Sequence, residues 1–308
     1  MNAWHSEQML RSLFFHQKLH EWRLVALFDD LYALSGQAAR WPWDLQHLGI
    51  DEEAWNKVIH RGIKPILVFA HPETLQQVPG SVAYYRMMAM VSQKSMQRIE
   101  HNVIALEEGR RLPSPSEALE LSRRFNRIIS VLIASDEILR EEELWLWRGM
   151  SAGSQADGSW RNRKGKEAEI ILWTWLTNVL RAHGWQQHGR GRWGKGDLVV
   201  EAASEPDIQV RREDEVLAAV EVKGGRDPAG VLERIGAAVK TLQRVKDTYP
   251  AATTVLVLRQ DAVTEAAQRE WHRQRAAINA VFFLEELAST PKPDTDAQKR
   301  FLQYLRLM

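Results

Sequence analysis

The sequence contains no cysteine and no apolar run of the length that crosses a bilayer. The first absence excludes disulfides, cysteine-based zinc sites and thiol nucleophiles, and it agrees with a reducing compartment. The second predicts no transmembrane helix, because about 20 mostly apolar residues are needed to span the hydrocarbon core. The first residues also lack a basic region followed by an apolar stretch, so we expect no signal peptide and a cytoplasmic protein.

Neither sign of charge is in excess, since 41 Lys and Arg face 40 Asp and Glu in the 308 residues. This balance excludes a uniformly basic nucleic-acid coat protein, but it leaves room for a local basic surface. The hydrophobic share of 44% and the charged share of 26% are typical of a globular protein with one large domain or two modest ones.

Charge and periodicity divide the chain into two halves. Residues 1–150 carry 17 basic and 19 acidic side chains, and residues 151–308 carry the remaining 24 and 21. The small, polar stretch 151–158 has no periodicity, so we expect a loop or linker there. We therefore predict two domains, a helical one over residues 1–150 and a second one over residues 151–308.

The first half has apolar residues at three- and four-residue steps, which predicts helices. The periodic segments cover roughly residues 9–34, 81–108 and 116–147. The short apolar run 66–70 lies between Pro65 and Pro72 and is either a strand or a buried turn.

The second half alternates between helical and strand-like segments, which predicts an α/β fold with a mixed sheet flanked by helices. We expect strands at 198–203, 207–212, 216–223, 253–258 and 281–284, and helices at 165–182, 229–246, 264–277 and the end of the chain.

The residues that suggest chemistry are Pro206-Asp207 and, after 13 intervening residues, Glu221-Val222-Lys223. Side chains two apart on a strand share a face, so Glu221 and Lys223 point the same way and Val222 points into the opposite layer. If the second and third strands pair as a hairpin, Asp207 lies beside Glu221. Two carboxylates and one ammonium then converge.

Such a set suits phosphodiester hydrolysis. Carboxylates are hard ligands for Mg²⁺, which polarises the phosphate, and an ammonium stabilises the transition state. The alternative is a solvated charge pair on an exposed strand. The functional interpretation is favoured because Glu221 follows the apolar run Val216–Val220, where a charge needs a partner or a metal.

These residues resemble the PD-(D/E)XK signature of nucleases, in which a helix with a glutamate precedes the strands. Here Gly165-Lys-Glu-Ala-Glu169 matches that helix, and the stretch 221–238 resembles type II restriction endonucleases more narrowly. Phe69-Ala-His-Pro72 and Tyr84-Tyr-Arg86 in the first half are similar to the XcyI group. The resemblance implies a PD-(D/E)XK core, cleavage of double-stranded DNA with Mg²⁺ and, for the XcyI group, the palindrome CCCGGG.

The resemblance also implies roles for single residues. Asp207 and Glu221 would bind metal, and Lys223 would orient or activate water. The helix acid is either Glu167 or Glu169, and the Gly-x-x-x-Glu spacing favours Glu169 as a third metal ligand. The alternative for both glutamates is a helix N-terminal charge that the macrodipole favours.

A basic surface is expected next to this set. Residues 160–196 carry eight basic and two acidic side chains, and 188–196 are also rich in glycine. We expect DNA contacts, to phosphate more than to bases, from Arg190, Arg192, Trp193, Lys195 and Arg226. The alternatives are a flexible surface hairpin at 188–196 and a plain turn around Arg226. Lys240 and Gln243 either support the site or are surface residues of their helix.

The sequence thus predicts a type II restriction endonuclease. Its nuclease domain would cover residues 151–308, and the helical domain over residues 1–150 would support DNA recognition and dimerisation. Cutting both strands of a palindrome calls for two-fold symmetry, so we expect a homodimer. A methyltransferase acting on the same DNA site would be its functional partner. Two other hypotheses stay open: a repair or structure-specific nuclease of the same superfamily, and a non-catalytic DNA-binding or interaction module.

Overall fold

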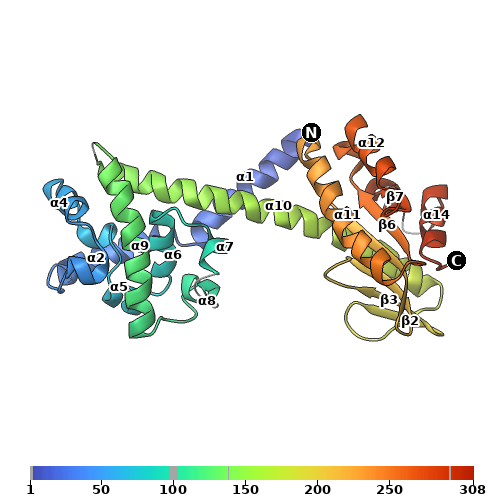
Figure 1. The fold of residues 1–308 in the computed structure, drawn as a ribbon, viewed down its shortest axis with the longest axis horizontal. Coiled ribbons are helices and arrows are strands. Elements are labelled where there is room, and N and C mark those ends of the chain that lie inside the picture. Colours follow the sequence, from blue (N-terminus) through green and yellow to red (C-terminus); the bar gives the residue numbers. More distant parts are fainter. Residues whose placement is uncertain (1–2, 98–102, 138, 291–292) are drawn as a thin grey trace. The chain divides into compact units, whose positions relative to one another are not determined.

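The computed structural model describes residues 3–97, 103–137, 139–290 and 293–308. The chain forms two compact units, Met1–Trp160 and Arg161–Met308. One long helix, α10 (Glu141–Ala182), belongs to both units (Figure 1). In the described residues, no helix is both long and apolar enough to serve as a membrane span.

The first unit is helical, as expected. It contains α1 (Ala3–Glu21), α2 (Ala26–Ala38), α3 (Leu45–Leu48), α4 (Glu52–His60), η1 (Pro65–Leu67), α5 (Pro72–Gln77), α6 (Ser81–Met88), α7 (Gln93–Met96), α8 (Val103–Glu107), α9 (Pro115–Ser135) and the first part of α10. Helix α9 begins with a capping box, in which Ser114 and Glu117 each accept a hydrogen bond from the other's backbone N–H. The apolar side of α9 packs into a single core with α2, α4 and α6.

The prediction of a loop or linker at residues 151–158 is wrong, because these residues form an uninterrupted part of α10. Ala152, Ala156 and Trp160 recur every four residues and are buried. Trp160 lies against Phe14 of α1, and Asp157 pairs with Arg11 at 3.0 Å. Within residues 151–158 the buried positions are held by two alanines, so this part of the helix carries little apolar signal in the sequence.

Two other expected helices are interrupted. The segment 81–108 breaks after α6, where Met90 adopts a left-handed backbone with φ of 52° and Ser92 caps α7; residues 98–102 of it lie outside the described residues. The segment 116–147 divides into α9 and α10. The run 66–70 is a buried turn that begins in η1, and Ala70 N donates to Asn126 Oδ1 at 2.7 Å.

The second unit is built on a seven-stranded sheet whose strands follow chain order. They are β1 (Gln186–Gln187), β2 (Arg192–Lys195), β3 (Leu198–Ala202), β4 (Ile208–Arg212), β5 (Glu215–Lys223), β6 (Thr253–Leu258) and β7 (Ala280–Phe283). Strands β1 to β5 pair antiparallel, and β5, β6 and β7 pair parallel. The five predicted strands are confirmed, and β1 and β2 were not predicted because they lack apolar alternation.

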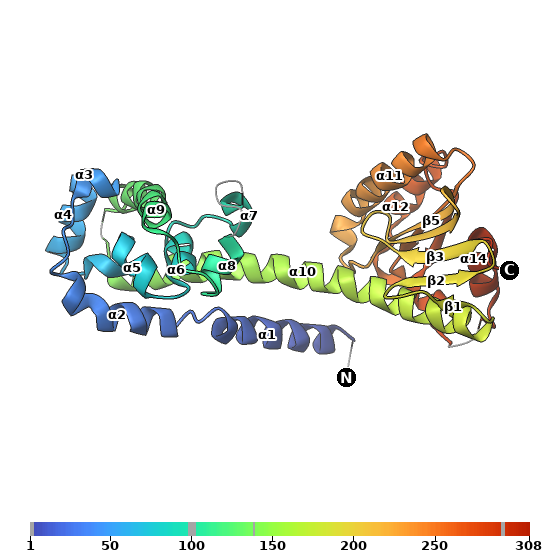
Figure 2. The same ribbon diagram turned by 90° about the horizontal axis from the view of Figure 1, so that it is seen from below.

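Helices cover both faces of this sheet (Figure 2). Helix α10 and α14 (Asp296–Tyr304) pack on one face, together with α13 (Leu284–Leu287). Helices α11 (Val231–Thr248) and α12 (Glu265–Arg273) pack on the other. Two single turns, η2 (Pro228–Gly230) and η3 (Gln260–Ala262), follow β5 and β6. The expected α/β fold, a mixed sheet flanked by helices, is confirmed.

Candidate active site

The hairpin of β4 and β5 brings the two predicted carboxylates together. Its register pairs Ile208 with Val220, so the preceding Asp207 lies across from Glu221. Val222 N donates a hydrogen bond of 2.7 Å to Asp207 Oδ2. The predicted hairpin is therefore present, and Asp207 is bonded to the backbone between Glu221 and Lys223.

Glu221 is buried at the end of the central strand, with 3% of its surface exposed. Its Oε1 accepts a hydrogen bond of 2.5 Å from Lys223 Nζ. Its Oε2 is buried and has no hydrogen-bond partner among the described residues. Val222 points to the opposite layer, into the apolar cluster beneath α10, as strand alternation predicts. A buried carboxylate oxygen without a partner is costly, so this position is a candidate ligand site.

The electrostatics of the two acids agree with their burial. The pKa of Asp207 is raised to about 7, chiefly by burial. The Val222 N–H opposes this rise, the carboxylates of Glu221 and Glu169 contribute to it, and Lys223 opposes it. Burial also raises the pKa of Glu221, against the hydrogen bond and charge of Lys223. The negative charge of Glu169 thus acts on both buried acids and that of Glu205 acts on Glu221, and a cation would relieve this repulsion.

Helix α10 presents Glu169 to the site. Glu169 adds negative charge at both Asp207 and Glu221, and its side chain is 30% exposed beside Lys166 at 3.1 Å. Glu167 is 53% exposed and faces Lys164 at 3.9 Å. Of the two candidate helix acids, the structure brings Glu169 into the field of the hairpin carboxylates.

Gly224 allows α10 to approach the end of β5 closely. It follows Lys223 directly, and a Cβ built on it would lie 2.3 Å from Ala168 Cβ and 3.0 Å from Lys164 O. Only glycine fits this contact between the end of β5 and α10, and Ala168 is fully buried beneath it. The contact fixes the helix turn that carries Glu169.

The donor set fits a hard divalent cation in its chemistry. Carboxylate oxygens are what Mg²⁺ prefers, and the unpartnered Glu221 Oε2 is available to accept one. Among the described residues, no three His, Asp or Glu side chains converge as a ready set of metal ligands. Lys223 takes one oxygen of Glu221 and the Val222 N–H takes one of Asp207, so small side-chain movements would be needed to gather the ligands.

The strand register places the basic residues of segment 188–196 at two opposite ends of the sheet. The exposed Arg190 lies in the β1–β2 turn and the exposed Arg192 begins β2. Both lie at the Asp207 end of the sheet, because Gly191 O accepts from Ala202 N and Ala203 N donates to Asp207 O. Lys195 lies at the opposite end and donates to His183 O at 2.9 Å. Three strand spacings of about 4.8 Å separate Arg190 from the strand of Glu221, which puts it roughly 14 Å away.

Two other expected DNA contacts look different in the structure. Trp193 is buried in the core, with Arg181 over its ring at 5.4 Å, so the ring is not offered to a ligand. Arg226 pairs with Asp261 at 3.4 Å beyond the ends of β5 and β6. Asp227 accepts from Ala229 N in the turn before α11, so a side-chain carboxylate satisfies this backbone N–H.

Helix α11 meets the hairpin through residues that the sequence did not single out. Lys240 is exposed, and Gln243 donates to Asp247 at 2.8 Å. It is Arg244 that reaches the β3–β4 loop, where its Nη1 lies 3.2 Å from Glu205 Oε2. The helical period of 3.6 residues could have pointed to Arg244 in the sequence. Buried Ala238, Thr241 and Val245 mark the inner side of the helix, and Arg244 borders that side.

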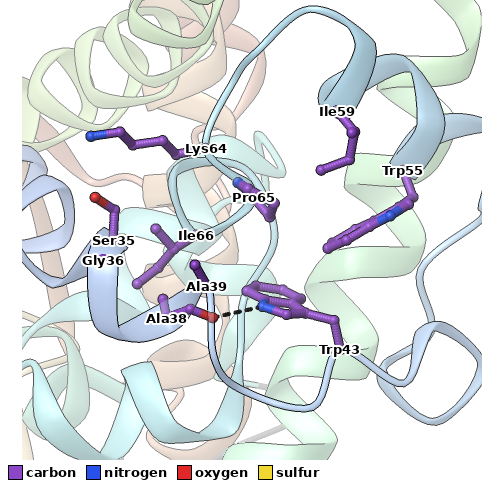
Figure 3. Close-up of a pocket in the computed structure, with 10 residues that line it drawn as sticks. All are labelled: Ser35, Gly36, Ala38, Ala39, Trp43, Trp55, Ile59, Lys64, Pro65 and Ile66. Atoms are coloured by element: carbon purple, nitrogen blue, oxygen red, sulfur yellow. Dashed lines mark hydrogen bonds between the residues drawn. The ribbon is translucent and has the colours of Figure 1, made fainter.

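A separate pocket lies in the first unit (Figure 3). It has a volume of about 490 Å³, and Trp43 and Trp55 form one wall with ring centroids 5.3 Å apart. Trp43 Nε1 is satisfied by Ala38 O at 3.0 Å, and Lys64 is the one charged residue of the lining. Its one hydroxyl, that of Ser35, donates to Tyr32 O at 2.6 Å, and the described lining contains no acid or histidine to activate it, so hydrolytic chemistry is not favoured here.

A mixed sheet between helical layers, with carboxylates and a lysine at one end of its central strands, defines a restriction-endonuclease-like protein. The family model described as XcyI restriction endonuclease matches residues 17–289. The chain belongs to this family, which confirms the resemblance found in the sequence.

A particular relative can be named. The chain is 26% identical over 211 residues to the type II restriction enzyme XcyI of Xanthomonas campestris pv. cyanopsidis. The match covers 60% of this chain and 61% of the relative. The chain thus spans about three fifths of the length of the curated relative it matches.

Proposed function

We propose that this protein is a Mg²⁺-dependent type II restriction endonuclease that hydrolyses double-stranded DNA at a short palindrome. The observation that carries the proposal is the hairpin that joins Asp207 to the buried, half-satisfied carboxylate of Glu221 beside Lys223. Membership of a restriction endonuclease family supports DNA cleavage as the chemistry. The description of the relative as a type II restriction enzyme supports cleavage at a defined site.

In this proposal Asp207, Glu221 and Glu169 hold the metal. Bound Mg²⁺ would supply Lewis acidity at the scissile phosphate and a more acidic water. Lys223 stands 2.5 Å from Glu221 and 24% exposed, so its ammonium can face the attacking water and the charge that grows on the phosphate. Glu169, from a different element, closes the site on the side of α10.

The remaining parts of the proposal follow from palindromic cleavage. Each chain has one catalytic set, so the two cuts call for a homodimer. A methyltransferase that protects the same site in cellular DNA would be the functional partner, and the enzyme would act in the cytoplasm with that DNA. The resemblance to the XcyI group makes CCCGGG the recognition sequence to test first.

Digestion of plasmid or phage DNA tests this proposal. Purified protein is incubated with DNA in Mg²⁺ and, in parallel, in EDTA, and the ends of the fragments are sequenced. We expect discrete fragments in Mg²⁺ alone, all ending at one short palindrome.

Two other results would replace the proposal. Cutting confined to branches, flaps or damaged positions would indicate a repair or structure-specific nuclease of similar fold. Intact DNA with every divalent metal and substrate would indicate a non-catalytic module, in which Glu221 and Lys223 form an ordinary charge pair.

A further inference from the structure

A groove of about 280 Å³ begins beside the candidate active site. Pro206, the residue before Asp207, lies at one end of it, and the groove extends between β4, the start of β5 and the second half of α11. Two guanidinium groups line it, those of Arg211 on β4 and Arg244 on α11. Glu205 is its one acid, and the rest of its polar lining is uncharged.

Both arginines are held weakly. Arg244 pairs with Glu205 at 3.2 Å, but the two side chains are 68% and 59% exposed. Exposed ion pairs of this kind contribute little to stability. Arg211 reaches Asp214 O at 3.3 Å, Gln209 Oε1 at 3.5 Å and Glu201 Oε1 at 3.9 Å. With the described residues, neither guanidinium makes the short, paired hydrogen bonds that a carboxylate or phosphate gives to a tightly bound arginine.

The groove has the right place for a DNA strand that enters the hairpin site. Arg211 is four residues from Asp207 along β4, a separation of roughly 13 Å at about 3.3 Å per residue. A DNA strand rises by about 3.4 Å per nucleotide along the helix axis, so about four nucleotides cover that distance. The groove therefore lies within reach of phosphates that flank the one being cleaved.

We propose that this groove binds backbone phosphates of the substrate DNA next to the scissile one, through Arg244 and Arg211. Glu205 occupies Arg244 in the free protein, and the phosphate takes its place on binding. The inference rests on the proposed function, since it assumes that DNA enters at Asp207 and Glu221. It gives α11 a direct role in positioning the strand.

Duplex binding in EDTA tests the groove without cleavage. We measure the affinity of a fluorescent duplex carrying the cleaved site, by anisotropy, over a range of salt concentrations. Arg244→Ala and Arg211→Ala should each weaken binding about tenfold, the usual effect of losing one charged hydrogen bond. Each should also lower the dependence of log affinity on log salt by about one ion.

Glu205→Gln should change the affinity for duplex DNA in the opposite direction. It removes the carboxylate that competes for Arg244, so it should tighten duplex binding by up to about fivefold. Arg212→Ala is the matched control, because Arg212 is the next residue on β4 but pairs with Asp197 on the other face of the sheet. It removes the same charge and should leave affinity and salt dependence close to those of the wild type.

The results separate this proposal from the one on which it rests. Should Arg244→Ala and Arg211→Ala match Arg212→Ala while the wild type cuts DNA, the groove proposal is wrong and the nuclease stands. Weaker binding by Glu205→Gln would also overturn the groove proposal. If the wild type neither binds nor cuts DNA, both fall. Arg244 is mostly exposed, so Arg244→Ala remains decisive even if Arg211→Ala fails to fold.

Discussion

At the scale of single residues, the protein places charge where a stable fold alone would not. Glu221 ends an apolar central strand, is almost fully buried and keeps one oxygen without a partner. Asp207 faces it, and burial raises the pKa of that carboxyl to about 7. Perturbed, clustered acids of this kind are a general mark of functional sites. The sequence alone predicted that Asp207, Glu221 and Lys223 converge, because Glu221-Val222-Lys223 stands at the end of an apolar run.

Lys223→Ala is expected to remove cleavage and spare DNA binding. Lys223 would act on the charge that develops during reaction, and loss of one such group typically lowers the rate by about 10²–10³. Single-turnover cleavage and duplex binding in EDTA measure the two effects. Lys240→Ala, a change of the same charge at an exposed position of α11, serves as control. Equal cleavage rates for the two variants would refute the role of Lys223.

Asp207→Asn is expected to alter the pH dependence of stability. An unfolded aspartate titrates near 3.9, so the raised folded pKa means that folding favours the protonated carboxyl. The metal-free protein therefore loses stability as pH rises from about 4 to 7 through this group. Asparagine does not titrate, so in EDTA the variant should gain free energy of unfolding over the wild type, more at pH 8 than at pH 5. Urea unfolding measures this; a pH-independent difference would contradict it.

At the scale of elements, the site depends on how α10 packs against the end of β5. The β4–β5 hairpin supplies Asp207, Glu221 and Lys223, and α10 supplies Glu169. Gly224 permits the close approach of the two elements at Ala168. The geometry of the site is thus set by a contact between small residues that do no chemistry themselves.

Gly224→Ala is expected to destabilise the fold and lower cleavage. The added methyl group would overlap Ala168 and the backbone of α10, and overpacking of this kind costs about 1–3 kcal/mol. Gly236→Ala on α11 is the matched control: apart from the helix's own backbone and the two neighbouring residues, no described atom lies within 4 Å of the added Cβ, and alanine favours a helix by about 1 kcal/mol. Thermal unfolding should show opposite shifts. A neutral Gly224→Ala would contradict the packing account.

Much of the second unit follows from sequence, and less of the first. The apolar and β-branched runs predicted β3 to β7, with β6 at its observed bounds, and thereby the hairpin. Strands β1 and β2 were not predicted, because their Arg, Gly, Lys and Gln residues do not give the alternation of apolar and polar residues that is typical of a strand. Periodicity cannot show chain reversals such as the one at Met90, nor that the small residues 151–158 form the side of a helix packed on α1. Contacts such as Gly224 with Ala168 depend on tertiary structure and have no local signature.

At the scale of the whole molecule, the chain has two units, each with its own core, and one helix that continues from the first into the second. The candidate chemistry lies entirely in Arg161–Met308. The predicted role of the first unit in DNA recognition and dimerisation stays a prediction. What the whole molecule must supply, under the proposed function, is a second active site for the second strand.

The protein is therefore expected to be a dimer, with a mass twice the 35.5 kDa of one chain. Two chains related by a two-fold axis would match the symmetry of a palindrome and present one catalytic set to each strand. Sedimentation equilibrium with and without a duplex measures this mass. A mass of 35.5 kDa under both conditions would refute the dimer.

The most direct test of the central claim is cleavage of plasmid DNA in Mg²⁺ by Glu221→Gln, compared with the wild type and with Glu215→Gln. Glu215 begins the same strand and is exposed, so its variant makes the same chemical change away from the site. We expect the wild type and Glu215→Gln to give identical discrete fragments, and Glu221→Gln to leave the DNA intact while it still binds duplex. If Glu221→Gln cuts as fast as the wild type, the β4–β5 hairpin is not the active site.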